Sequence, residues 1–434
     1  MKMSSSKWNA LAWMFLCCGF SLFSGSCMDG GPANGMVDFK GVYYDTQCMI
    51  QHTDPYLVGE PLRVYLLAYG GQQAPSQVLR QILAYNVYLP TSSILIAPIA
   101  MLPWGFAHIL WRLLTAIALF LTASLIWSFG ANYSLVLTSG IACFFLLNCE
   151  AIFATGNTAG VAVALCVIGV WCIMQERFIW PGMFCMAVGL LIKPHDAGLV
   201  WLFFLLAGGV YRKRALQTLV LTVVLGLPSI VWISEIAPNW MQELHTNLRL
   251  VSQPGGSSDP GPASALNGKG PSMIINLQSD FSIFRNDPHF YNLASYLVCG
   301  TLLLIWAIIT VRSRPTSSRA WLGLAAVIPL AILVVYHRPY DAKLLLLTLP
   351  ACAILWAGGG VIAWIALLVT LAGVVMTADL PLAFLMMLTE KLHFSEGVAG
   401  RMMTTVLTRP VPLILLAMSF FYLWAYLQRD AERG

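Results

Sequence analysis

The sequence contains very little charge for its length. Only 10% of its 434 residues are Asp, Glu, Lys or Arg, whereas 58% are hydrophobic and the mean hydropathy is +0.75. Soluble domains carry about 25% charged residues. A soluble core could not hide this much apolar surface from water. The composition therefore excludes a soluble globular protein and indicates a polytopic integral membrane protein.

Several other signals are absent. The chain has no long Lys or Arg run and a net charge of only +5, so we expect no nucleic-acid partner. None of its eleven cysteines stands in a CxxC or Cys/His metal spacing, and most lie within apolar runs as small buried residues. Cys27 and Cys48 could form a disulfide if the loop between them is extracytoplasmic. No polar stretch is long enough for a separate soluble domain, so residues 1–434 are predicted to form a single transmembrane domain.

Apolar runs long enough, or nearly long enough, to cross a bilayer recur along the chain. We expect twelve crossings, with the first retained as a helix and not cleaved as a signal peptide. They lie at residues 8–24, 105–129, 133–153, 158–174, 178–193, 196–211, 216–234, 291–311, 320–336, 344–357, 360–378 and 411–427. A further apolar piece at 88–104 is interrupted by three prolines, which favours an interfacial or re-entrant element.

Basic residues set the expected orientation. With twelve crossings and the N-terminus inside, all four basic segments face the cytoplasm, and a thirteenth crossing at 88–104 would turn two of them outward. These segments are residues 175–177, 211–214, 312–319 and 428–434. The outer face would then hold the first loop 25–104, the turn 192–198, the loop 235–290, the turn 336–343 and the segment 379–410. The loop 235–290 is rich in Gly, Pro and Ser and is expected to be flexible, as a lid or a disordered excursion.

Three of these outer segments carry charge of both signs. The polar residues are Asp38 and Asp45 in the first loop, Lys193, His195 and Asp196 in the second segment, and His337, Arg338, Tyr340, Asp341 and Lys343 in the third. The basic side chains suit a phosphate-bearing substrate, and a carboxylate nearby could accept a proton from a hydroxyl nucleophile. Each residue also has an ordinary interpretation. Charged residues in outer loops are usually just solvated, and Tyr43 and Tyr44 could be aromatic residues at the membrane interface. Lys193 could extend its ammonium group to the interface from a helix end, and Arg338–Asp341 could be a local ion pair.

Five short motifs, in order, are similar to a known family. They are "DFKGVYYDTQCMIQHTDPY" (38–56), "YNVYLPTSSILIAPIAMLPW" (85–104), "GNTAGVAVAL" (156–165), "LLIKPHDAGLVWLFFLL" (190–206) and "HRPYDAKLLLLTLP" (337–350). Over about residues 40–350 the chain resembles the polyprenyl-phosphate-mannose-dependent mannosyltransferases of the GT-C superfamily, glycosyltransferase family 87, formerly DUF2029. It departs from the family pattern at Leu89–Thr91 and Asn157, and by an Arg-Pro insertion before Tyr340.

The resemblance implies an all-α polytopic GT-C-type fold with about twelve transmembrane helices and interfacial helices in the first extracytoplasmic loop. It implies a hexosyltransferase of the bacterial plasma membrane and cell envelope that works on the extracytoplasmic side. The donor would be a polyprenyl-phosphate sugar, with mannose expected, and the acceptor a glycolipid or lipid-linked glycan. No metal and no cofactor is expected, because basic side chains would neutralise the negative charge of the leaving phosphate.

By motif match, Asp38 is the expected catalytic base in an inverting single displacement, with Asp45 as the second choice. Lys193, His337 and Arg338 are the expected stabilisers of the leaving phosphate. Other expected substrate contacts are Tyr43, Tyr44, Tyr88, His195, Tyr340 and Asp341. Two alternatives remain at this stage. A lipid or sugar transporter would show internal repeats and charges near the bilayer midplane, and a non-catalytic scaffold would have no need of Asp38.

Overall fold

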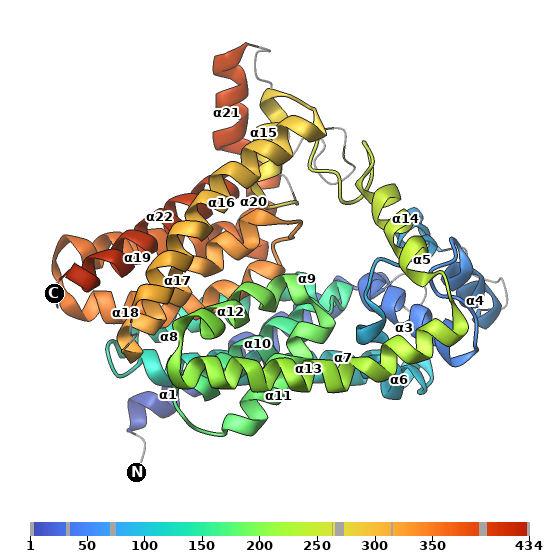
Figure 1. The fold of residues 1–434 in the computed structure, drawn as a ribbon, viewed down its shortest axis with the longest axis horizontal. Helices are drawn as coiled ribbons and strands as arrows, with labels where there is room; N and C mark the ends of the chain where they lie inside the picture. Colours follow the sequence, from blue (N-terminus) through green and yellow to red (C-terminus); the bar gives the residue numbers. More distant parts are fainter. Residues whose placement is uncertain are drawn as a thin grey trace.

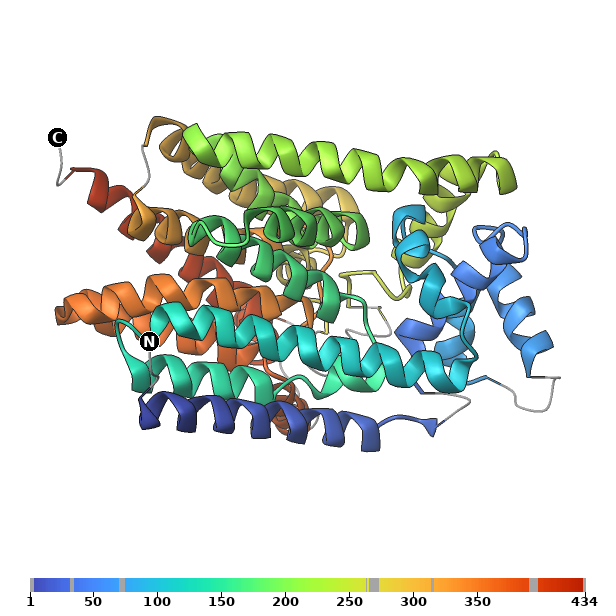
Figure 2. The same cartoon turned by 90° about the horizontal axis from the view of Figure 1, so that it is seen from below.

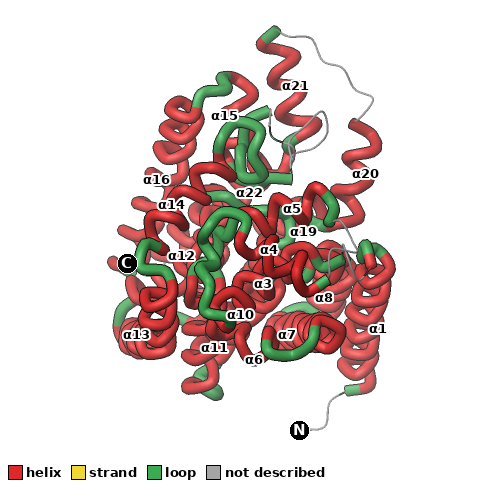
Figure 3. Tube along the Cα trace, turned by 90° about the vertical axis from the view of Figure 1, so that its right-hand side faces the viewer, coloured by secondary structure: helices red, strands yellow, loops and turns green. Residues whose placement is uncertain are grey.

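A computed structural model of the protein describes residues 4–31, 35–69, 75–262, 264, 273–313, 316–389 and 397–431. Parts of the predicted basic segments 312–319 and 428–434 lie outside these residues. Over the described ranges helices are the regular structure and no strand occurs, as the colouring of Figure 3 shows. The expected all-α polytopic fold is therefore confirmed.

Eight helical segments among the described residues are long and apolar enough to cross a membrane. They are α1 (Ser5–Cys27), α7 (Trp104–Gly130), α8 (Leu135–Leu147) with α9 (Glu150–Thr155), α13 (Gly209–Ile236), α16 (Pro288–Arg312), α17 (Ser317–Val334), the 3₁₀ helix η1 (Asp341–Thr348) with α18 (Leu349–Gly358), and α22 (Pro410–Ala431). A ninth crossing is possible if α19 (Gly360–Met376) and α20 (Asp379–Thr389), which meet at a 73° bend, form one span.

The remaining predicted crossings are shorter helices. They are α10 (Ala159–Met174), α11 (Ile179–Ile192) and α12 (Pro194–Ala207), of 16, 14 and 14 residues. Each is below the roughly 20 residues that a full crossing needs. α10 and α11 pack closely because glycines face each other. A Cβ atom on Gly169 would lie 2.8 Å from the carbonyl oxygen of Gly182. Small residues of this kind let helix backbones approach in membrane proteins.

The first predicted outer loop, 25–104, folds into four short helices. They are α3 (Val37–Ile50), α4 (Glu60–Ala68), α5 (Gln77–Ala84) and α6 (Pro90–Ala100). They lie together at one end of the helical bundle, at the right of Figure 1 and Figure 2. At 11 residues, α6 is too short to cross a bilayer, which agrees with an interfacial or re-entrant element at 88–104. α1 begins and α22 ends at the opposite end of the bundle, as expected if both termini share one side.

The segment 235–290, which we expected to be a flexible loop, contains two helices. α14 (Trp240–Ser252) and α15 (Leu277–Phe284) are regular helices, and residues 263 and 265–272 lie outside the described part. The Gly/Pro/Ser-rich composition belongs to the middle of the segment. α14 is held by tertiary contacts, because Asn247 donates hydrogen bonds to the carbonyl oxygens of Tyr56 (3.0 Å) and Asn86 (3.1 Å).

Two further segments complete the comparison with the sequence. The predicted outer segment 379–410 contains α20 and a second helix, α21 (Val398–Thr408), while residues 390–396 lie outside the described part. Cys27 and Cys48 do not form the disulfide that was considered. Both are free thiols, with Cys27 exposed and Cys48 buried in the packing of α3.

Candidate active site

Asp38 lies in the first turn of α3, where its side chain is only 7% exposed. Its Oδ2 accepts a 2.8 Å hydrogen bond from Nδ2 of Asn157. The Asn157 Oδ1 accepts from the backbone N–H of Ala159 (2.9 Å), which settles which end of the amide faces the carboxylate. Asn157 is placed by Gly156, whose φ of +67° ends α9 and turns the chain into α10.

Lys193 is positioned by the proline that follows it. The residue before proline avoids helical backbone angles, so α11 ends at Ile192 and α12 begins at Pro194. Nζ of Lys193 lies 2.7 Å from Oδ1 of Asp341, and the two side chains are 9% and 2% exposed. Oδ2 of Asp341 accepts the backbone N–H of Arg338 at 2.8 Å. The expected ion pair of Arg338 with Asp341 is thus a backbone contact, and Lys193 is the cation that pairs with this carboxylate.

His337 lies in the segment between α17 and η1, with both ring nitrogens engaged. Nδ1 faces the carbonyl oxygens of Ile332 (3.0 Å) and Val335 (3.1 Å), and Nε2 lies 3.1 Å from Oδ1 of Asp196. Burial lowers the pKa of His337, but the hydrogen bond and charge of Asp196 outweigh it, so the pKa lies above its usual value. His195 approaches the same oxygen less closely, at 3.8 Å, and its side chain is 39% exposed.

Arg338, Tyr340 and Tyr88 complete the group around Asp38. The charge of Asp38 acts on all three side chains and on Lys193. Burial lowers the pKa of Arg338, whereas Tyr340, Tyr336 and Asp38 raise it, and the net shift is upward. Burial raises the pKa of the Tyr88 and Tyr340 phenols, and the nearby carboxylates add to this effect. Residues from three distant parts of the sequence therefore lie within electrostatic reach of the Asp38 carboxylate.

Tyr43 and Tyr44 pack against neighbouring aromatic rings. Both are buried, at 5% and 3% exposure, and the Tyr43 hydroxyl donates to the carbonyl oxygen of Leu102 at 2.8 Å. Their rings pack edge-to-face with Trp104 (5.2 Å between centroids) and Tyr65 (5.3 Å) respectively. The structure gives these two tyrosines a packing role between α3, α4 and α7.

Asp45 lies seven residues after Asp38 in α3 and therefore on the same side of the helix. It is 2% exposed, and its Oδ1 has no hydrogen-bond partner within the described part of the chain. Burial raises the pKa of Asp45 well above its usual value. Burial of this kind disfavours the charged form of a carboxyl group, which makes Asp45 a weaker candidate for the base than Asp38.

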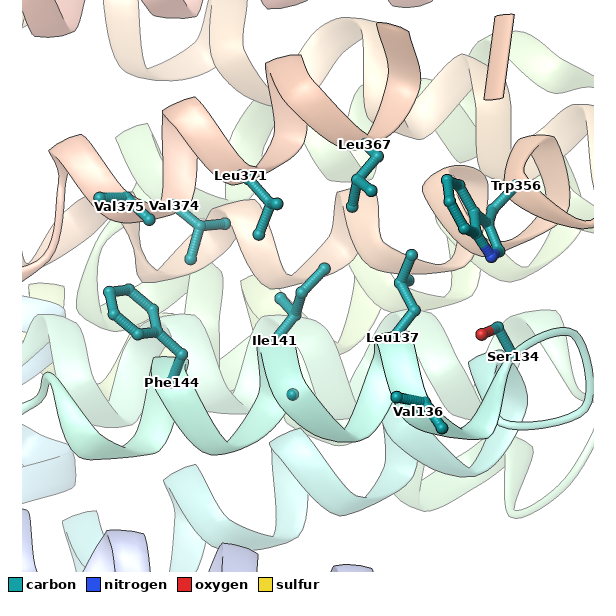
Figure 4. A pocket seen from close by; sticks show the side chains of 11 residues that line it. Ser134, Val136, Leu137, Ile141, Phe144, Trp356, Leu367, Leu371, Val374 and Val375 are labelled. Carbon is teal, nitrogen blue, oxygen red and sulfur yellow. The ribbon is translucent and has the colours of Figure 1, made fainter. Parts of the chain in front are cut away.

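A separate groove of about 500 Å³ lies between α8 and α19. Figure 4 shows the side chains of Leu137, Ile141 and Phe144 on one side facing Leu371 and Val374 on the other. The residues that line this groove carry no charge. The groove suits an apolar chain and supplies no group for acid–base chemistry.

Comparison with known proteins agrees with the resemblance seen in the sequence. The sequence model of glycosyltransferase family 87 matches residues 86–268. The resemblance to glycosyltransferase family 87 is therefore confirmed. No curated protein and no solved structure matches the chain. The family match, with the many apolar helices, indicates a membrane glycosyltransferase.

The matched region of family 87 contains only some of the candidate site residues. Tyr88, Asn157, Lys193 and His195 fall within residues 86–268, whereas Asp38 and the His337–Asp341 segment fall outside. Sequence reasoning did not name Asn157 as a site residue, although the motif at 156–165 contained it. It placed Asp196 in a polar turn, but it could not pair this carboxylate with His337, which is 141 residues away.

Proposed function

We propose that this membrane glycosyltransferase moves a hexose, with mannose as the expected sugar, from a polyprenyl-phosphate donor to an acceptor hydroxyl. The acceptor would be a glycolipid or lipid-linked glycan. The reaction would take place on the extracytoplasmic side of a bacterial plasma membrane. The observation that carries the proposal is the buried Asp38 carboxylate, which accepts a hydrogen bond from Asn157 and whose charge acts on Lys193, Arg338 and two phenols.

In the proposed reaction, Asp38 accepts the proton of the acceptor hydroxyl. The freed oxygen forms a bond to the anomeric carbon as the bond from that carbon to the phosphate oxygen breaks. The configuration at the anomeric carbon is inverted. Polyprenyl phosphate leaves as a phosphate monoester, with one more negative charge than it carries in the donor. Lys193, Arg338 and His337 are the proposed stabilisers of this charge. Asn157 would keep the carboxylate aimed at the acceptor.

The proposal is tested by comparing two substitutions on the same helix. Asp38→Asn removes the base and should lower the turnover number by about 10²–10⁴-fold, the usual contribution of general base catalysis. Asp45→Asn is the matched control, because it replaces a second buried carboxyl of α3 by an amide of the same shape. It should keep most of the activity.

The assay would use purified protein in nanodiscs with a panel of polyprenyl-phosphate hexoses as donors. Nucleotide sugars would serve as negative-control donors. The stereochemistry of the product would be read by NMR. Full activity in Asp38→Asn, or an equal loss in Asp45→Asn, would remove the base from the mechanism. Transfer from nucleotide sugars alone would overturn the donor class.

A further inference from the structure

His195, Asp196 and His337 converge on one point beside the Asp38 group. One ligand atom from each, an imidazole nitrogen or a carboxylate oxygen, lies within 4.8 Å of the other two. Nε2 of His337 is 3.1 Å and Nε2 of His195 is 3.8 Å from Oδ1 of Asp196. The two rings are 5.1 Å apart between centroids. Neighbouring ligands of a four-coordinate metal ion stand at similar separations, since each lies about 2.0–2.2 Å from the metal.

The orientation of the His337 ring leaves Nε2 as the atom available for a ligand. Its Nδ1 faces two backbone carbonyl oxygens, those of Ile332 and Val335. A carbonyl oxygen only accepts hydrogen bonds, so Nδ1 carries a proton. Nε2 and a carboxylate oxygen of Asp196 then face each other and need a proton or a cation between them. Metal-bound histidines commonly anchor the other ring nitrogen on a backbone carbonyl in this way.

Asp196 supplies an independent observation. Its side chain is only 1% exposed, yet Oδ2 has no hydrogen-bond partner among the residues that the structure describes. A buried carboxylate oxygen without a partner is costly, so such an atom needs an explanation. A metal ion bound by both oxygens of the carboxylate would satisfy it. The His195 ring, at 39% exposure, leaves the point accessible from outside.

The charges around the site also favour a cation. Lys193 is already paired with Asp341, and His337 with Asp196. Basic side chains that are already paired with carboxylates have less charge to offer a phosphate. A divalent ion would add positive charge while Asp341 offsets the nearby Lys193 ammonium. Two imidazoles and one carboxylate form a ligand set typical of Zn²⁺ and related transition metals, whereas Mg²⁺ prefers oxygen ligands only.

We propose that His195, Asp196 and His337 form a binding site for a divalent transition-metal ion. The site itself rests on the geometry of these three residues. Its use, as an additional contact for the donor phosphate, rests on the proposed glycosyltransferase function. The test therefore measures metal binding directly, so that failure of the sugar-transfer assay and failure of the metal site can be told apart.

The experiment titrates Co²⁺, a spectroscopic probe for Zn²⁺ sites, into tag-free full-length protein that has been dialysed against EDTA. We expect about one Co²⁺ per chain with visible d–d absorption, displaced by Zn²⁺ and not by excess Mg²⁺. His195→Ala should weaken binding at least tenfold, because it removes one of three ligands from a partly exposed position. His245→Ala, which removes an exposed histidine of α14, is the matched control and should bind as the wild type does.

The proposal is overturned if the wild type binds no stoichiometric Co²⁺ or Zn²⁺. It is also overturned if His195→Ala and His245→Ala bind the metal equally well. Asp196→Asn gives a second reading, because the amide keeps the shape of the side chain and loses its charge. Unchanged affinity in this variant, in protein with native helix content, would likewise exclude the site.

Discussion

Replacing Lys193 by methionine should destabilise the protein strongly, because the change leaves a buried carboxylate without its cation. The Lys193 Nζ to Asp341 Oδ1 distance is 2.7 Å, and the two side chains are 9% and 2% exposed. Breaking a buried pair from one side typically costs about 3–5 kcal/mol. Asp341 would keep one charge-assisted hydrogen bond, from the backbone N–H of Arg338 at 2.8 Å. We therefore expect the lower part of the range, about 3 kcal/mol.

The double variant Lys193→Met/Asp341→Asn separates charge from packing. An amide at 341 can still accept the Arg338 N–H and carries no charge that needs a partner. We expect it to recover about 2 kcal/mol of the loss, which is a coupling energy well above that of independent sites. Lys213→Met, at an exposed position in α13, is the control and should change stability by less than about 0.5 kcal/mol.

The assay is reversible unfolding of each variant in mixed micelles with increasing SDS, followed by circular dichroism. The reasoning fails if Lys193→Met is as stable as the Lys213→Met control. It also fails if the double variant is no more stable than Lys193→Met. Sugar transfer by the folded double variant then measures separately whether the Lys193 ammonium is needed at the phosphate.

Two further predictions concern other parts of the fold. Gly156→Ala should destabilise the protein by about 2–4 kcal/mol, from left-handed backbone strain plus overpacking. Its φ is +67°, and a Cβ atom would lie 2.7 Å from that of Phe39. Gly19→Ala in α1, where nothing lies within 4 Å, is the control, and equal SDS midpoints in the two variants would contradict the argument. Burial, and then the hydrogen bond and charge of Asp54, raise the pKa of Glu243 to about 7. A raised carboxyl pKa gives stability that is present below the unfolded value, about 4.3, and is lost as the pH rises through about 7. The wild type should therefore lose more stability between pH 5 and pH 8 than Glu243→Gln does, and parallel pH profiles of the SDS midpoint would refute this.

The helical elements follow largely from the sequence alone. An apolar run inside a bilayer satisfies its backbone only as a helix, so hydropathy is a local signal that needs no tertiary information. All twelve predicted crossings contain helix, but only eight coincide with described helices long and apolar enough to cross a membrane, or nine if α19 and α20 form one span. The breaks that place the site are local as well. The Lys193–Pro194 step and the positive φ of Gly156 are consequences of proline and glycine chemistry.

In two places, tertiary contacts outweigh the local preference that composition suggests. The segment 235–290 looks mobile because its middle is rich in Gly, Pro and Ser. α14 nevertheless forms within it, because Asn247 bonds to the backbone of the first loop. Tyr43 and Tyr44 likewise pointed to sugar or membrane contacts. Their rings are instead enclosed by Trp104 and Tyr65, which the sequence alone could not bring next to them.

The sequence by itself determined the class of the protein, its helices and the candidate base. Hydropathy, proline breaks and motif order can all be read from the sequence without tertiary information. Only the tertiary structure decided the partners. Asp38 meets Asn157 across 119 residues, Lys193 meets Asp341 across 148, and Asp196 meets His337 across 141. Which carboxylate compensates which cation depends on how helix ends pack in three dimensions. This pairing determines which side chains remain available to hold a proton, a phosphate or a metal ion.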